Sequence, residues 1–71
     1  MLRTIGQVIN EVRREKRVSL AEIVALGISK SRYYRFIEGE IDMSMIDMMS
    51  IMDALTISFS ELGLLTGKSR F

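Results

Sequence analysis

The strongest constraint on the fold is a helix-start signal that recurs along the chain. At four places an apolar run with helical spacing is opened by a Ser or Thr that is followed three residues later by Gln, Glu or Asp. In such a capping box the hydroxyl accepts a backbone N–H of the first turn, and the later side chain bonds back to the cap. The chain also has no proline, so the pattern predicts an all-α protein. The four pairs are Thr4 with Gln7, Ser19 with Glu22, Ser44 with Asp47, and Ser58 with Glu61.

Two glycines and one further serine complete the division of the chain into five predicted helices. Gly27 and Gly39 each follow a predicted helix, and glycine ends helices because it adopts the left-handed conformation without steric cost. Ser29 is placed to cap a helix between these two glycines. Residues 67–71 have no pattern and are expected to fray. The predicted helices span residues 4–16, 19–26, 30–38, 44–55 and 58–65.

Apolar residues at helical spacing give each of the first four helices a predicted buried face. In the fourth, five of the six methionines lie within residues 43–52. We favour the interpretation that all five belong to the core, because a small domain must use every apolar residue. The alternative is that Met45 and Met49, on a neighbouring flank, contact a second copy or a downstream domain. The predicted buried sets are Ile5, Val8, Ile9 and Val12; Leu20, Ile23 and Val24; Tyr33, Phe36 and Ile37; and Met48, Ile51, Met52 and Leu55.

Composition removes most catalytic and metal-binding chemistry. The 71 residues include no Cys and no His, so a disulfide, a thiol or imidazole nucleophile, and a zinc site built from these ligands are all excluded. We therefore expect neither an enzyme nor a metal or cofactor. A small hydrolase using Glu38, Glu40 and Asp42 would need two carboxylates fixed around a cleft, whereas these three fall in and after a predicted turn.

No segment indicates a membrane span or an export signal. The runs without a charged residue are far shorter than the roughly 20 residues that a membrane span needs. The first residues lack the apolar region of a signal peptide. We therefore expect a cytoplasmic protein.

The net charge of +1 averages two halves of opposite sign. Residues 1–35 carry eight bases and three acids, whereas residues 36–71 carry two bases and six acids. The first half therefore suits a polyanion and the second does not. Ordinary solvated surfaces are the alternative explanation.

The predicted third helix has one apolar side and one basic side. No acid occurs between Ala25 and Ile37, whereas solvated faces usually mix signs. A short basic helix that follows another short helix by a tight turn is typical of a DNA recognition helix, whose first turns face base edges in the major groove. Arg can pair with guanine, and Ser or Lys can hold phosphates. The basic side carries Lys30, Ser31, Arg32, Tyr34 and Arg35.

Several short motifs at fixed spacing resemble one family of DNA-binding domains. The chain resembles the helix-turn-helix domain of phage-repressor-like (XRE, or Cro/cI-type) regulators, and within that group the N-terminal domain of Rgg-type, peptide-responsive regulators. The resemblance covers about residues 4–65. The matching motifs are Ser19-Leu20, Ser29-Lys30-Ser31, Arg35-Phe36 with Gly39-Glu40, Met52-Asp53-Ala54-Leu55 and Ile57-Ser58-Phe59.

The resemblance implies a lambda-repressor-like five-helix bundle whose second and third helices form the helix-turn-helix. Two positions depart from the pattern. Ile37 stands where relatives usually carry an acid, and Val24 stands where a small alanine is common, which would hold the two helices slightly farther apart. The resemblance implies base or groove contacts by Ser31, Arg32 and Arg35, and phosphate contacts by Gln7, Arg13, Arg14, Ser19 and Lys30.

In Rgg-type proteins a peptide-binding, dimerising domain follows this one. We therefore interpret residues 1–66 as the DNA-binding domain and residues 67–71 as a frayed tail or the start of a linker to an absent C-terminal domain. A homodimer on DNA is expected, formed through the methionine-rich helix or through that absent domain.

The predicted function is that of a sequence-specific DNA-binding domain of a bacterial transcriptional regulator, with double-stranded DNA as its partner. The alternative is a helical protein-interaction module, antitoxin-like or an adaptor, whose basic face meets an acidic protein.

Overall fold

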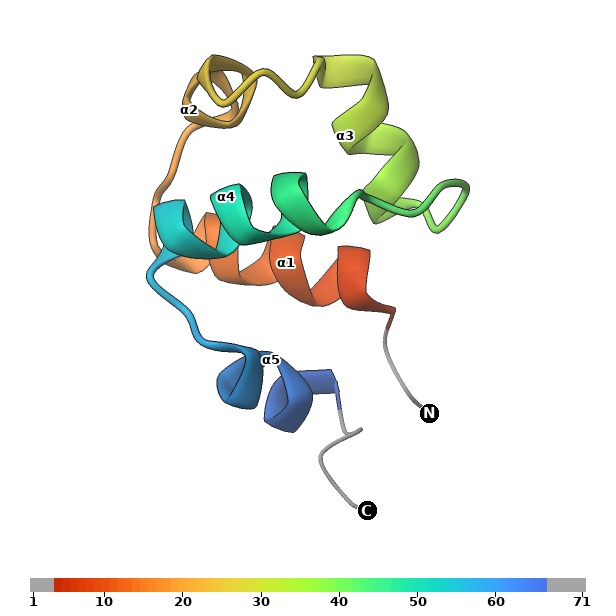
Figure 1. The fold of residues 1–71 in the computed structure, drawn as a ribbon. Coiled ribbons are helices and arrows are strands. Elements are labelled where there is room, and N and C mark those ends of the chain that lie inside the picture. The colour runs from red at the N-terminus through yellow and green to blue at the C-terminus, as the bar shows by residue number, and fades with distance from the viewer. Residues whose placement is uncertain (1–3, 67–71) are drawn as a thin grey trace.

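The computed structural model describes residues 4–66 and folds them into five helices without a strand (Figure 1). The all-α, five-helix prediction is therefore confirmed. Each helix starts within one residue of its predicted start and ends within one residue of its predicted end. The elements are α1 (Ile5–Glu15), α2 (Leu20–Ala25), α3 (Lys30–Ile37), α4 (Met45–Leu55) and α5 (Phe59–Thr66). The predicted tail, 67–71, lies outside the described residues.

Each helix begins at a hydroxyl that accepts a backbone N–H from three residues later. At Thr4 both halves of the capping box form, because the Gln7 side chain also accepts the Thr4 N–H at 3.1 Å. Ser29 caps α3, as its position predicts, by accepting the Arg32 N–H at 3.1 Å. These caps satisfy donors that a helix cannot satisfy internally. The remaining caps are Ser19 for α2, Ser44 for α4 and Ser58 for α5.

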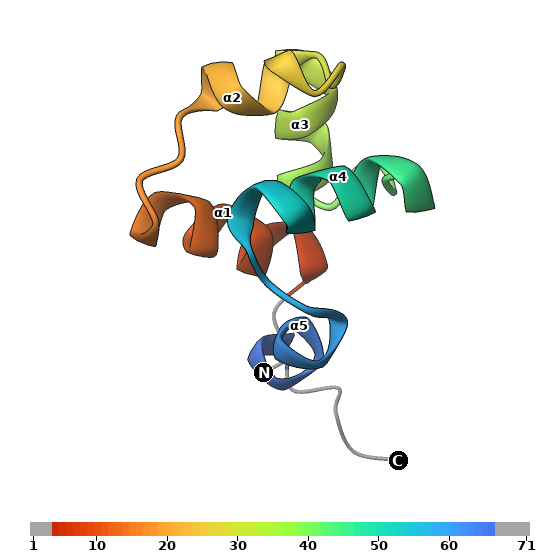
Figure 2. The same ribbon diagram turned by 60° about the vertical axis from the view of Figure 1, so that its left-hand side comes forward.

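Glycines make the two turns that set the direction of α3. Gly27 has a φ of 95° and Gly39 has a φ of 80°. Residues with a Cβ rarely adopt such backbone angles. The first turn lets α3 leave α2 at a steep angle, which both views of the ribbon show (Figures 1 and 2). The turn at Gly39 directs the chain back towards α4.

The helices form three tiers. In both views α2 and the start of α3 lie on one side, α1 and α4 lie in the middle, and α5 lies on the opposite side (Figures 1 and 2). The core between them contains most of the predicted faces of α1, α3 and α4, together with two residues from the turns, Ile28 and Ile57. The most deeply buried side chains are Val8, Ile9, Ile23, Ile28, Tyr33, Ile51 and Leu55.

Four residues predicted to be buried are exposed. Val24 is 43% exposed. The six residues of α2 complete fewer than two turns, and Ile23 is the one residue of this helix that is buried. Ile5 lies at the open N-terminal end of α1. Met45 and Met49 are exposed on α4, because Ile51, Met52 and Leu55 define its buried side. The interpretation that all five methionines are core is therefore wrong.

The start of α1 and the end of α3 touch at Gly6. A Cβ built on Gly6 would overlap the Phe36 carbonyl oxygen and lie 2.8 Å from the Ile37 Cα. Only a residue without a side chain allows the two backbones to come this close. Gly6 therefore fixes where the far end of α3 sits on the scaffold.

Candidate nucleic-acid interface

The outward side of α3 carries four exposed polar side chains while its inward side is buried. Tyr33 and Phe36 hold the helix to the core, so the residues on the opposite side of the helix point away from the core. Within residues 4–66, the Lys30 and Ser31 side chains make no hydrogen bond to protein. The exposed set is Lys30, Ser31, Tyr34 and Arg35. The structure thus brings these four predicted site residues together on one helix.

The charge on this side changes sign along α3. Lys30 opens the helix and Arg35 lies in its last turn, whereas Glu38 and Glu40 follow its end. Arg35 Nε lies 3.9 Å from a Glu40 carboxylate oxygen, too far for a hydrogen bond. A hydrogen bond with Glu40 raises the pKa of Glu38. A polyanion would therefore be attracted by the bases of α3 and repelled by the two acids that follow the helix.

Arg32 lies on the flank of α3 that faces α4. Its Nη2 donates to Asp47 Oδ2 at 2.9 Å and lies 3.6 Å from the Met43 sulfur. This hydrogen bond lowers the pKa of Asp47. Asp47 stands in the first turn of α4, where an acid also favours the helix N-terminus. No sequence pattern indicates that Asp47 is the partner of Arg32.

Arg13 is held inside the scaffold. Its Nη1 donates to the Val18 carbonyl at 2.9 Å, and its Nε donates to the Tyr33 hydroxyl at 3.1 Å. Its Nη2 and the Tyr33 hydroxyl both donate to Asn10 Oδ1 at 3.1 Å. All three guanidinium nitrogens are therefore used within the protein, where they tie α1 to α3 and to the turn before α2.

Tyr33 is the buried hydroxyl at the centre of this network. None of the surface of Tyr33 is exposed to solvent. Burial raises the pKa of the Tyr33 phenol, and the hydrogen bond from Arg13 opposes part of that rise. The neutral phenol is the form that donates to Asn10, so the network requires Tyr33 to keep its proton.

Lys16 joins the ends of α1 and α4. Its Nζ donates to the Leu55 carbonyl at 2.7 Å and to the Thr56 hydroxyl at 3.2 Å. A cation is favoured here, since the last carbonyls of a helix carry partial negative charge. Thr56 itself adopts the left-handed conformation that ends α4. The position of Lys16 in a basic run did not predict this capping role.

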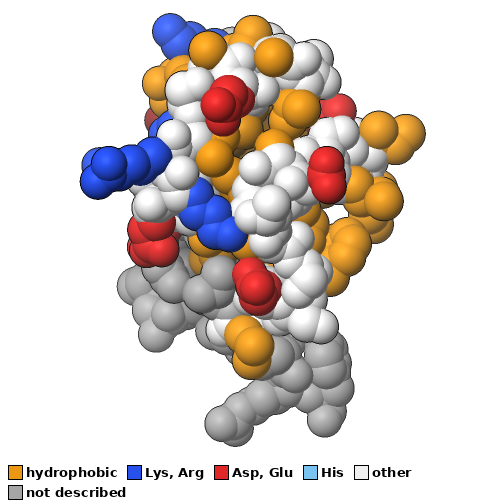
Figure 3. Space-filling view, turned by 90° about the vertical axis from the view of Figure 1, so that its left-hand side faces the viewer, with side chains coloured by type: hydrophobic (Ala, Val, Ile, Leu, Met, Phe, Trp, Pro, Cys, Tyr) orange, Lys and Arg blue, Asp and Glu red, His pale blue; other side chains and the backbone are white. Residues whose placement is uncertain are grey.

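The other predicted phosphate contacts lie on α1 and at the start of α2. Arg14 is exposed near the end of α1, and Ser19 caps α2. Figure 3 shows the side of the molecule where α1 ends and α2 begins, and there basic and acidic side chains are interspersed. Gln7 uses its side-chain oxygen to cap α1.

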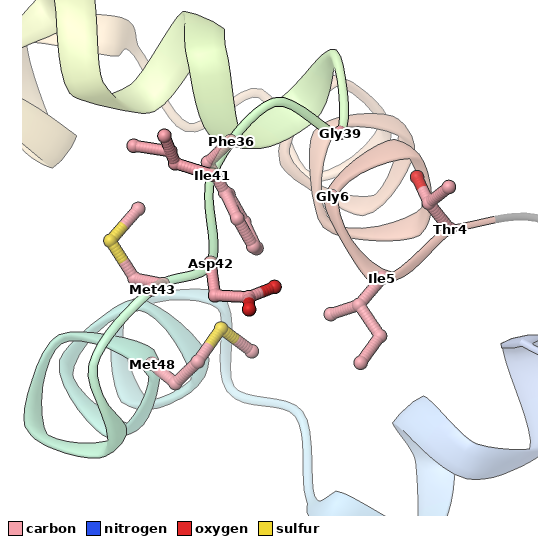
Figure 4. A pocket seen from close by; sticks show the side chains of 9 residues that line it. All are labelled: Thr4, Ile5, Gly6, Phe36, Gly39, Ile41, Asp42, Met43 and Met48. Carbon is pink, nitrogen blue, oxygen red and sulfur yellow. The ribbon is translucent and has the colours of Figure 1, made fainter.

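A largely apolar groove opens on another part of the surface. It encloses about 400 Å³ between the start of α1, the turn after α3 and the start of α4 (Figure 4). Ile5, Ile41, Met43 and Met48 line it, and Asp42 supplies its one carboxylate. Residues 4–66 contain no cluster of side chains suited to hold a metal ion, and none of their helices is long and apolar enough to cross a membrane.

Comparison with known proteins identifies no relative. No protein-family model matches the chain, and neither the curated proteins nor the solved structures contain a match. The resemblance to XRE and Rgg-type domains therefore rests on the sequence motifs.

Proposed function

We propose that this chain is a DNA-binding domain in which α2 and α3 act as a helix-turn-helix. The observation that carries the proposal is the outward side of α3, where Lys30, Ser31, Tyr34 and Arg35 are exposed together. An α-helix fits the major groove, and Arg, Ser and Lys are side chains that contact bases and phosphates there. The buried opposite side of α3 gives the helix a fixed support.

The proposed orientation follows from the charges on α3. The helix itself, rather than the turn after it, faces the DNA, because Lys30 and Arg35 attract phosphates while Glu38 and Glu40 repel them. Recognition helices of this class commonly use their N-terminal residues to read bases, and Ser31 lies in that first turn. Arg35 lies in the last turn, but its long exposed side chain is on the same side as Ser31 and Tyr34, and it is the proposed base reader.

The motifs shared with XRE and Rgg-type domains support a role in bacterial transcriptional regulation, in the cytoplasm. Pairing of two copies on DNA is part of the proposal. The α4 residues Met45, Ile46 and Met49 are 64%, 76% and 54% exposed, and exposed apolar side chains of this kind serve as contact surfaces. A downstream domain would be the other occupant of this surface.

The same apolar residues favour a second candidate function, a helical protein-interaction module. Exposed Phe59 and Leu64 on α5 add to them. In that case the basic side of α3 would meet an acidic protein rather than DNA, and duplex DNA would bind weakly and without sequence preference.

A titration with duplex DNA separates the two candidates. Duplexes selected by the protein from a randomised pool are titrated at rising salt while fluorescence anisotropy is recorded. We expect log affinity to fall by about 0.9 per log unit of salt for each phosphate neutralised. We also expect Arg35→Ala to weaken binding of the selected duplex by about tenfold or more.

The matched control is Arg17→Asn, which removes one positive charge from an exposed position outside α3. Asparagine suits that site because Arg17 has a φ of 58° and asparagine tolerates the left-handed conformation. We expect it to leave sequence preference unchanged. Failure of the folded wild-type protein to bind any duplex at low salt would contradict the proposal.

A further inference from the structure

The two arginines beside the outward side of α3 differ in how they are held. Arg35 is 57% exposed, and its nearest acid, Glu40, is 3.9 Å away. The Arg32 side chain is 43% exposed but donates to Asp47 at 2.9 Å. Arg35 is therefore free to change rotamer, whereas Arg32 is attached to a second helix.

The residue that holds Arg32 is itself anchored by its backbone. Asp47 lies in the first turn of α4, where its own backbone N–H donates to the Ser44 hydroxyl at 3.2 Å. Its side chain is 24% exposed. The hydrogen bond from Arg32 is the main reason that the pKa of Asp47 is lowered, and a bond with Ser44 adds to it. The carboxylate is therefore charged at neutral pH, and its backbone is anchored in the capped first turn of α4.

Arg32 keeps donors for a further partner. A guanidinium has five N–H donors, and Arg32 uses Nη2 for Asp47 and Met43. Its Nε and Nη1 make no hydrogen bond within residues 4–66. An arginine restrained in this way loses less conformational freedom when it binds a planar acceptor pair than an unrestrained arginine does.

The carboxylate also changes what Arg32 attracts. A phosphate that approaches Arg32 meets the negative charge of Asp47 a few ångströms away, so the purely electrostatic attraction is reduced on every DNA sequence. The paired acceptors of guanine are neutral and suffer less from that charge. The pair therefore lowers non-specific binding more than it lowers a base contact.

We propose, on the basis of the proposed function, that Asp47 is a specificity-determining positioning residue for the α3 surface. It holds Arg32 against α4, offsets its charge towards phosphates, and leaves its remaining donors oriented for one base pair. Specificity at the flank of α3 thus depends on an acid from the next helix.

The experiment compares the selected duplex with a scrambled duplex of the same composition, using the whole chain at several salt concentrations. The main variant is Asp47→Asn. The matched control is Asp53→Asn, which makes the same change of charge at an exposed position on the same helix. Urea unfolding shows that each variant is folded before binding is measured.

We expect Asp47→Asn to bind the scrambled duplex more tightly and to reduce the ratio of selected to scrambled affinity by about tenfold. Its salt slope on the scrambled duplex should steepen by up to about 0.9, as one more phosphate is neutralised. Asp53→Asn should change both affinities together and leave the ratio within about twofold. Asp47→Glu restores the carboxylate and should recover most of the ratio.

Arg32→Lys tests the other member of the pair. This substitution keeps the positive charge but removes the planar pair of guanidinium N–H donors. We therefore expect the variant to keep its affinity for the scrambled duplex and to lose its preference for the selected duplex. An unchanged ratio in Asp47→Asn, or equal changes in Asp47→Asn and Asp53→Asn, would overturn the inference while the proposed function stands. Absence of duplex binding by the wild-type protein would overturn both.

Discussion

The basic residues at the end of α1 and those on α3 are alike in the sequence but differ in what they touch. At the end of α1, Arg13 binds Val18, Tyr33 and Asn10, and Lys16 caps α4. On α3, Lys30 and Arg35 are exposed. Arg13 and Lys16 therefore stabilise the fold, whereas Lys30 and Arg35 are available to a partner. A run of bases in a sequence does not distinguish the two.

The largest effect is expected where the other end of α1 meets α3, at Gly6. Gly6→Ala places a methyl group against the backbone of Phe36 and Ile37. We expect it to lower the free energy of unfolding by about 3 kcal/mol, although alanine is the better helix former. Urea unfolding measures this change. Ala54→Gly, at an exposed site of α4, is the control and should cost about 1 kcal/mol; equal costs would contradict the close contact.

The next effect separates the two arginines at the end of α1. Arg13→Ala removes the donors to Val18 and Tyr33 and should lower the free energy of unfolding by about 2 kcal/mol. Arg14→Ala, next to it and exposed, should change it by less than about 0.5 kcal/mol. Thermal and urea unfolding measure both. If the two substitutions cost the same, Arg13 does not have the structural role described above.

A smaller effect is expected at Lys16. Lys16→Met keeps most of the aliphatic chain but removes the ammonium that bonds Leu55 and Thr56. We expect a loss of about 1 kcal/mol, the size of a helix C-terminal charge interaction. Hydrogen exchange at the end of α4 should accelerate in this variant. Unchanged protection there would show that Lys16 does not hold the end of α4.

The smallest effect is a shift in the titration of Tyr33. In the Tyr34→Phe variant Tyr33 is the only tyrosine, so the absorbance of its phenolate can be followed alone. We expect its pKa to lie above the ordinary value of about 10, because burial disfavours the phenolate. The stability from the neutral phenol is therefore present below pH 10 and is lost as pH rises through the higher folded pKa. Titration at the ordinary value would contradict its burial.

The helices could be predicted from the sequence because their signals are local. The hydroxyl caps and Gly27 and Gly39 act within a few residues, so the starts and ends of the helices could be predicted closely. The depth to which each side chain is buried could not be predicted in this way, because it depends on residues that are distant in the sequence. Ile28 and Ile57 stand in turns and yet enter the core, since the turns pass over it.

The candidate site was partly predictable for the same reason. The exposed side of α3 follows from helical periodicity, so Lys30, Ser31, Tyr34 and Arg35 could be placed together. Asp47 is 15 residues from Arg32 in sequence, and their contact depends on how α4 packs beside α3. The roles of these residues in binding DNA stay predictions.

The most direct test of the account is a comparison of backbone amide NMR spectra with and without a selected DNA duplex. We expect the largest shift changes on α3, at Ser31, Tyr34 and Arg35, and smaller changes on the exposed apolar side of α4 where two bound copies pair. Changes confined to Met45, Ile46 and Met49, or no change at any amide at low salt, would contradict the account.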